Sequence, residues 1–104
     1  MDQNIFKYQF GASVNMVEVE ASLVLAIIST ESLHGESQVR LDASHAMDIE
    51  QRSCVIDART LVGQDLNRLF IGYIRREFGE DAFRVERIRP EAEPNRRPAE
   101  PVPA

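Results

Sequence analysis

The sequence predicts an α+β fold, in which two helices cover one face of a four-stranded antiparallel sheet. Two observations lead to this fold class. Short segments alternate between apolar and polar residues, as half-buried strands do, and two longer segments repeat their apolar residues with the period of a helix. Along the chain these segments occur in the order strand, helix, strand, strand, helix, strand.

The N-terminal part of the chain predicts the first strand and the first helix. Residues 6–10, FKYQF, place three aromatic side chains on one face and two polar side chains on the other. Asn15, followed three residues later by Glu18, resembles a helix-capping pair. We therefore expect a helix that starts at Asn15, runs to about Leu33 and ends before Gly35.

Two further strands are predicted in the middle of the chain. Residues 39–43, VRLDA, and residues 54–58, CVIDA, both alternate between apolar and polar positions. The side chains expected to face inward are Val39, Leu41, Ala43, Cys54, Ile56 and Ala58. The polar segment between them, SHAMDIEQ at residues 44–51, predicts a long hairpin loop.

The second helix and the last strand complete the pattern. Thr60 is a suitable residue to begin a helix, and Gly79 is a suitable left-handed stop. Residues 82–88, AFRVERI, alternate again, with Phe83 and Val85 expected to face inward. Two strand–helix–strand units that share a hairpin are typical of a ferredoxin-like βαββαβ two-layer sandwich.

The composition of the chain changes at Pro90. The segment 90–104 holds all 5 prolines of the 104 residues and no aromatic residue. Such a segment cannot bury enough apolar surface to offset the entropy of ordering its backbone. We therefore expect one α+β domain over residues 1–89 and a disordered, proline-rich tail over residues 90–104.

Charge and hydropathy exclude several classes of function. The formal net charge of −5 disfavours nonspecific binding to nucleic acid, which requires clustered positive charge. The longest apolar run, around residues 21–28, is far shorter than the ~18 residues that a membrane span needs. The N-terminus shows no signal peptide, and the single cysteine, Cys54, cannot form an internal disulfide. These features predict a cytoplasmic protein that binds neither nucleic acid nor a membrane.

The predicted open face of the sheet argues against recognition of RNA. Domains that read RNA on a sheet stack bases on aromatic side chains. The expected face carries no aromatic residue and mixes both signs of charge: Lys7, Gln9, Gln38, Arg40, Asp42, Ser53, Val55, Asp57, Arg84 and Glu86.

No metal centre or cofactor site is expected. Zinc sites use clusters of cysteine, histidine and carboxylate ligands. This chain has one cysteine and two histidines, and we place His34 near a helix end and His45 in a solvated turn. We expect structural roles for both.

Two hypotheses give the chain a small-molecule function. Gly11 and Asn15 lie in the loop that enters the first helix, where backbone amides favour anions, so a regulatory domain could bind a small anionic metabolite there.

Asp42 and Asp57 fall on neighbouring predicted strands, where a close approach would raise one carboxyl pKa, so an enzyme could use this pair. No nucleophile, base and orienting group can be assembled from the remaining residues, and we expect no catalysis.

The first predicted helix has two apolar stripes instead of one. The stripe expected to pack on the sheet consists of Met16, Val19, Leu23, Ala26 and Ile27. The second stripe lies roughly opposite and consists of Val17, Ala21, Val24, Leu25 and Ile28. Packing beside the second helix could bury part of it, but exposed aliphatic patches usually mark an interface.

The second predicted helix has one core stripe and an unexpected glycine. The core stripe consists of Val62, Leu66, Leu69, Phe70, Tyr73 and Ile74. Gly72 falls on the opposite side, near Arg68 and Arg75, where glycine costs roughly 1 kcal/mol relative to alanine. Either the glycine is neutral, or another backbone approaches there while the arginines contact an acidic partner.

These observations favour a noncatalytic assembly or protein-interaction module. We expect it to form a homo-oligomer, or to bind another protein, through the second stripe of the first helix. The metabolite-binding and enzymatic hypotheses remain as alternatives.

Overall fold

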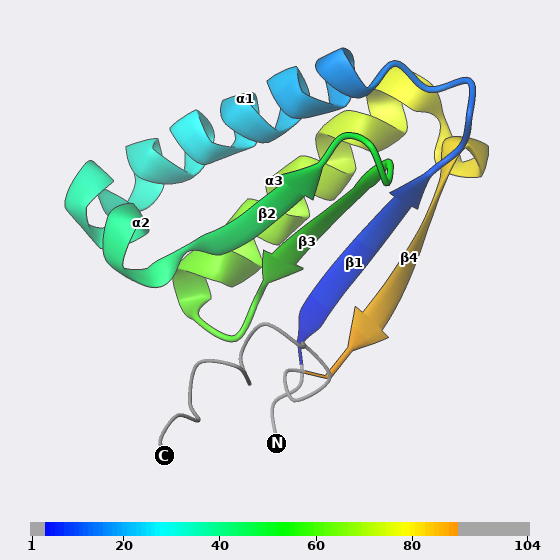
Figure 1. The fold of residues 1–104 in the computed structure, drawn as a ribbon. Helices are drawn as coiled ribbons and strands as arrows, with labels where there is room; N and C mark the ends of the chain where they lie inside the picture. The colour runs from blue at the N-terminus through cyan, green and yellow to red at the C-terminus, as the bar shows by residue number, and fades with distance from the viewer. Residues whose placement is uncertain (1–3, 90–104) are drawn as a thin grey trace.

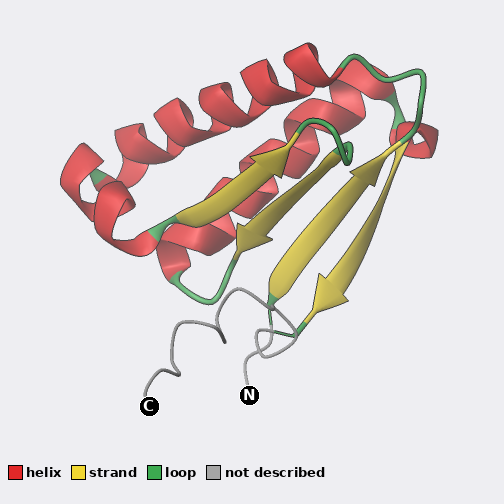
Figure 2. Ribbon diagram, viewed as in Figure 1, coloured by secondary structure: helices red, strands yellow, loops and turns green. Residues whose placement is uncertain are grey.

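The computed structural model describes residues 4–89, and the predicted tail, 90–104, lies outside the described residues. The fold is α+β, with a four-stranded antiparallel sheet and three helices (Figures 1 and 2). Its elements are β1 (Ile5–Phe10), α1 (Met16–His34), α2 (Glu36–Asp42), β2 (Ser44–Asp48), β3 (Ser53–Asp57), α3 (Leu61–Phe78) and β4 (Phe83–Ile88). A short 3-10 turn, Glu80–Ala82, joins α3 to β4.

The sheet has the strand order β2-β3-β1-β4, so the first strand of the chain lies in its interior. β1 pairs antiparallel with both β3 and β4, and Tyr8 stands opposite Cys54 and Val85. β2 and β4 are the two edges. The two long helices, α1 and α3, pack on the face of the sheet that carries Tyr8 (Figure 1).

Aromatic side chains from β1 form the centre of the core. Tyr8 is fully buried, stacks along the strand with Phe10 and meets Phe70 of α3 edge-on, with 5.0 Å between the ring centroids. Burial of each such side chain stabilises the fold by about 1.5–3 kcal/mol. The Tyr8 hydroxyl donates a hydrogen bond to Asn67 Oδ1 at 2.5 Å, which satisfies its polar end.

The predicted ends of the two long helices are confirmed. Asn15 Oδ1 accepts a hydrogen bond from the Val17 amide at 2.9 Å, and Thr60 Oγ1 accepts one from the Gly63 amide at 2.9 Å. Each side chain thereby satisfies an amide that has no partner inside its helix. Gly35 and Gly79 follow the two helices with φ of 90° and 88°, a conformation that residues with a Cβ rarely adopt.

The prediction of a strand at residues 39–43 is wrong, because residues 39–42 belong to α2 and Ala43 is the residue that follows the helix. Val39 is buried, whereas Leu41 is 78% exposed, so the apolar residues do not share a face as they would in a strand. Arg40 Nη2 donates to Glu36 Oε2 at 2.8 Å, across one helical turn. Such pairs at a spacing of four residues stabilise helices. The strand begins at Ser44, within the segment that we expected to be a loop.

This correction changes the open face of the sheet. Gln38, Arg40 and Asp42 belong to α2, and β2 contributes Ser44 and Ala46 in their place, opposite Asp57 and Val55. No aromatic side chain stands on this face among the described strands, because every strand aromatic aligns with Tyr8 or Phe10.

Two single positions also differ from expectation. His45 lies in strand β2, exposed on the helix side of the sheet opposite Ile56, and not in a turn. Val85 does face the helix side, opposite Tyr8, but it is 38% exposed because β4 is an edge strand.

Within residues 4–89, each helix is too short or too polar to cross a bilayer.

Candidate functional site

The outward face of α1 carries five apolar side chains that solvent reaches: Val17, Ala21, Val24, Leu25 and Ile28. The exposed fraction is 67% for Val17, 50% for Val24 and 53% for Ile28. The opposite side of the helix, with Val19 and Leu23, is buried against the core. Packing beside α3 therefore does not cover the second stripe. The expected division of α1 into a buried stripe and an exposed apolar stripe is what the structure contains.

Side-chain contacts with α3 hold α1 in place. His34 Nε2 lies 2.8 Å from Asp65 Oδ2, and Ser29 Oγ lies 2.9 Å from the Tyr73 hydroxyl. Thr30 is fully buried as well, and its hydroxyl donates within α1 itself, to the Ala26 carbonyl one turn earlier. Because α1 is anchored on its inner sides, its outward face is a preorganised surface.

Arg68, Gly72 and Arg75 all lie on α3, and the two arginines pair with different acidic residues of the chain. Arg68 pairs with Asp65 at 3.6 Å, and Arg75 Nε lies 3.5 Å from Glu80 Oε2. A Cβ added to Gly72 would meet no atom within 4 Å. No contact inside this protomer therefore requires glycine at this position.

The glycine that α3 does require is Gly63, which the sequence did not single out. A Cβ added there would lie 2.1 Å from the Asp57 carbonyl oxygen, in the backbone at the end of β3. Gly63 is buried, and it allows the first turn of α3 to pack directly on that backbone. A glycine three residues after a helix cap gives no sequence signal that distinguishes this role from chance.

The polar groups proposed to hold an anion in the loop before α1 already have partners. The Gly11 amide donates to the Ala82 carbonyl at 2.9 Å, and Asn15 Oδ1 caps the helix. Arg52, from the turn between β2 and β3, donates to the Gly11 carbonyl through Nε at 3.0 Å and also to the Val14 carbonyl. Arg52 thus fixes the loop from a distant segment, a role that the sequence did not indicate. Metabolite binding by Gly11 and Asn15 stays a prediction.

Asp42 and Asp57 do not form the strand pair on which the enzymatic hypothesis depended, since Asp42 ends α2. Gln38 Nε2 donates to Asp42 at 2.6 Å, and Arg59 donates to both oxygens of Asp57 at 2.9 and 2.7 Å. These hydrogen bonds from Arg59 lower the pKa of the Asp57 carboxyl. Asp57 is therefore a poor proton donor near neutral pH.

Cys54 is equally unsuited to chemistry, because burial raises the pKa of its thiol to about 12. A thiol that stays protonated is a weak nucleophile and a weak metal ligand. Within residues 4–89, no three histidine, cysteine, aspartate or glutamate side chains come together as metal ligands.

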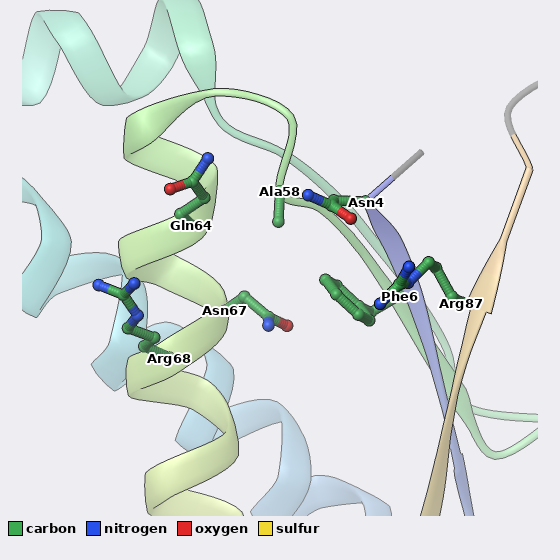
Figure 3. Close-up of a pocket in the computed structure, with 7 residues that line it drawn as sticks. All are labelled: Asn4, Phe6, Ala58, Gln64, Asn67, Arg68 and Arg87. Carbon is green, nitrogen blue, oxygen red and sulfur yellow. The ribbon is translucent and has the colours of Figure 1, made fainter. Parts of the chain in front are cut away.

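A cavity of about 370 Å³ opens between α3 and the strands β1 and β4, and we call it the Phe6 cavity (Figure 3). It is lined by Asn4, Phe6, Ala58, Gln64, Asn67, Arg68 and Arg87. These residues come from the start of the described chain, from the connection between β3 and α3, from α3 and from β4. The sequence did not predict the cavity, because no segment contains more than a few of its residues.

Comparisons of the chain with protein-family models, with curated proteins and with solved structures found no match. The function is therefore inferred from the geometry of the protein.

Proposed function

We propose that this chain is a noncatalytic self-association module and that the outward face of α1 is its contact surface. The observation that carries the proposal is the row of five exposed apolar side chains along the centre of that face. Acidic residues, Glu18, Glu20 and Glu31, lie only at its margins. Contact between two such faces removes apolar surface from water, which is favourable by roughly 25 cal/mol per Å².

The spacing of these side chains favours a second copy of the same chain as the partner. Val17, Ala21, Val24 and Ile28 follow one another at steps of four, three and four residues, as in the seam of a coiled coil. This series is the same when it is read backwards. In an antiparallel, twofold contact, Val17 therefore meets Ile28 of the second copy, and Ala21 meets Val24. A twofold interface uses the same patch on both subunits. The four residues Val17, Ala21, Val24 and Ile28, which we call the seam, meet that condition.

The size of the surface predicts weak association. The seam spans 12 residues, from Val17 to Ile28, which corresponds to about 18 Å of helix. A contact confined to one such helix buries less than the ~800 Å² per partner of a standard stable interface. We therefore expect a dimer that forms and dissociates with concentration in the micromolar range or above.

A pair of double variants tests the proposal. Val24→Glu with Ile28→Glu places like charges in the seam, and both positions are exposed, so the fold measured by circular dichroism is expected to persist. Leu41→Glu with Leu61→Glu is the matched control, because it makes the same chemical change at two apolar positions that are also exposed but lie outside α1. Mass in solution is measured by light scattering over a range of concentrations.

The expected result is a wild type and a control whose mass rises with concentration, and a Val24/Ile28 variant that stays monomeric. A wild type that is monomeric at every concentration contradicts self-association. A Val24/Ile28 variant that associates as well as the wild type contradicts the choice of surface, and one that unfolds contradicts the assignment of these side chains to solvent.

As to fold family and cellular location, we infer a ferredoxin-like sandwich in which α2 is an additional helix before β2. The alternation of strands and long helices and the two interior strands, β1 and β3, support this classification.

We place the protein in the cytoplasm, where a buried, unpaired thiol such as Cys54 stays reduced.

A further inference from the structure

We propose that the Phe6 cavity binds a small monocarboxylic acid with a planar, apolar body. This site is separate from the proposed self-association surface, because no residue of α1 lines the cavity.

The charge of the cavity favours an anion with a single negative charge. Two arginines and three amide side chains line it, and none of its described lining residues is acidic. Arg68 pairs with Asp65, and its guanidinium points away from Phe6 (Figure 3). Arg87 makes no ion pair with any described residue, and its guanidinium carbon lies 5.8 Å from the centroid of the Phe6 ring. One available guanidinium fork matches the two oxygens of a carboxylate, whereas a phosphate dianion calls for more positive charge.

Asn67 supplies a hydrogen-bond donor of fixed orientation. The Tyr8 hydroxyl donates to Asn67 Oδ1 at 2.5 Å, so the amide nitrogen Nδ2 is the free end of this side chain. Burial raises the pKa of Tyr8 and keeps its hydroxyl protonated as the donor. Figure 3 shows Asn67 extending from α3 toward the Phe6 ring. Asn67 Nδ2 therefore offers a hydrogen-bond donor on the α3 side of the cavity, while Arg87 offers its guanidinium on the strand side, beyond the Phe6 ring.

Phe6 and Ala58 shape the space for the body of the ligand. Phe6 is half-buried, so part of its ring contacts the core while the rest borders the cavity. Ala58 is small and buried, which leaves room beside the ring. Planar groups stack favourably on such a ring with an offset. A volume of about 370 Å³ is at the lower end of the range for small-molecule sites and suits a compact acid.

Benzoate is the simplest probe of this chemistry. The full chain, labelled with ¹⁵N, is titrated with sodium benzoate, and amide shifts are followed by NMR. Benzamide has the same shape without the charge, and inorganic phosphate tests the class of anion. We expect saturable shifts around Phe6, Asn67 and Arg87 with benzoate. Binding is expected to be at least about tenfold weaker with benzamide, because a charge-assisted pair is roughly twice as strong as a neutral one. It is expected to be weaker by a similar factor with phosphate, which calls for more positive charge than one guanidinium and has no planar body to stack on Phe6.

Three variants assign the binding to this site. Arg87→Gln removes the available charge, while Arg84→Gln makes the same change on the same exposed strand but on the opposite face of the sheet, beside Gln9. Asn67→Asp keeps an acceptor for the Tyr8 hydroxyl and adds a negative charge to the cavity. We expect benzoate affinity to fall about tenfold or more for Arg87→Gln and for Asn67→Asp, and to be unchanged for Arg84→Gln.

The proposal is overturned if benzoate causes no saturable shift, or if benzamide or phosphate binds as well as benzoate. Equal weakening by Arg84→Gln and Arg87→Gln overturns it too, since that result would indicate a general response to net charge. The spectrum of each variant without ligand shows whether it is folded, so a loss of binding is scored only in folded protein.

Discussion

At the scale of single residues, α3 contains two glycines whose surroundings are opposite. A Cβ on Gly63 would lie 2.1 Å from a backbone oxygen at the end of β3, whereas a Cβ on Gly72 would meet nothing within 4 Å. The first glycine permits contact between a helix and a strand. The second only adds backbone freedom to the unfolded chain and leaves part of the helix backbone uncovered. Gly72 stands out in the sequence because it interrupts a helical pattern. Gly63 does not stand out, because its role depends on contact with the backbone of Asp57, six residues earlier.

Substitution of each glycine by alanine tests this contrast. Gly72→Ala is expected to raise the free energy of unfolding by up to about 1 kcal/mol, the usual difference in helix propensity. Gly63→Ala is expected to lower it by about 1–3 kcal/mol or more, because the backbone of Asp57 must move away. Urea unfolding of the two variants beside the wild type measures both. A Gly72→Ala variant that is less stable, or that no longer self-associates, would indicate that another backbone does approach Gly72.

At the scale of elements, helix caps were predictable and the segment around α2 was not. Asn15, Thr60 and Gly79 act locally, through hydrogen bonds and backbone angles that depend on neighbouring residues, and the sequence contains that information. Seven residues are too few for helical periodicity to stand out from alternation, and a helix of this length is marginal alone. The conformation of this segment is decided by the packing of Val39 against the rest of the protein, and that packing cannot be read from the sequence.

Alanine substitutions at Val39 and Leu41 distinguish the observed helix from the predicted strand. In α2, Val39 is 5% exposed and Leu41 is 78% exposed. Val39→Ala is therefore expected to lower the free energy of unfolding by about 1–3 kcal/mol, and Leu41→Ala to leave it nearly unchanged. In a strand both side chains would face inward, and the two substitutions would be similarly destabilising. Thermal or urea unfolding gives the answer, and equal losses would contradict the helix.

At the scale of the whole molecule, the two candidate sites differ in how far the sequence could reveal them. The outward face of α1 lies within one helix, so its period was enough to predict it. The Phe6 cavity brings Arg87 of β4 beside Phe6 of β1 and Asn67 of α3. Arg87 becomes a neighbour of Phe6 because β4 returns to pair with β1, and Asn67 joins them because α3 packs on the same face of the sheet.

The net charge of the molecule gives a test that separates self-association through α1 from self-association through the arginines of α3. Each copy carries a formal charge of −5, so two copies repel one another at low ionic strength. Added salt screens this repulsion, with a Debye length that falls from about 30 Å at 0.01 M to about 8 Å at 0.15 M, and does not weaken an apolar contact. If the outward face of α1 is the contact, the dimer measured by sedimentation equilibrium is expected to become tighter as salt is raised over this range. If Arg68 and Arg75 instead bound acidic residues of a second copy, the same screening would loosen the dimer, and that result would move the interface from α1 to α3.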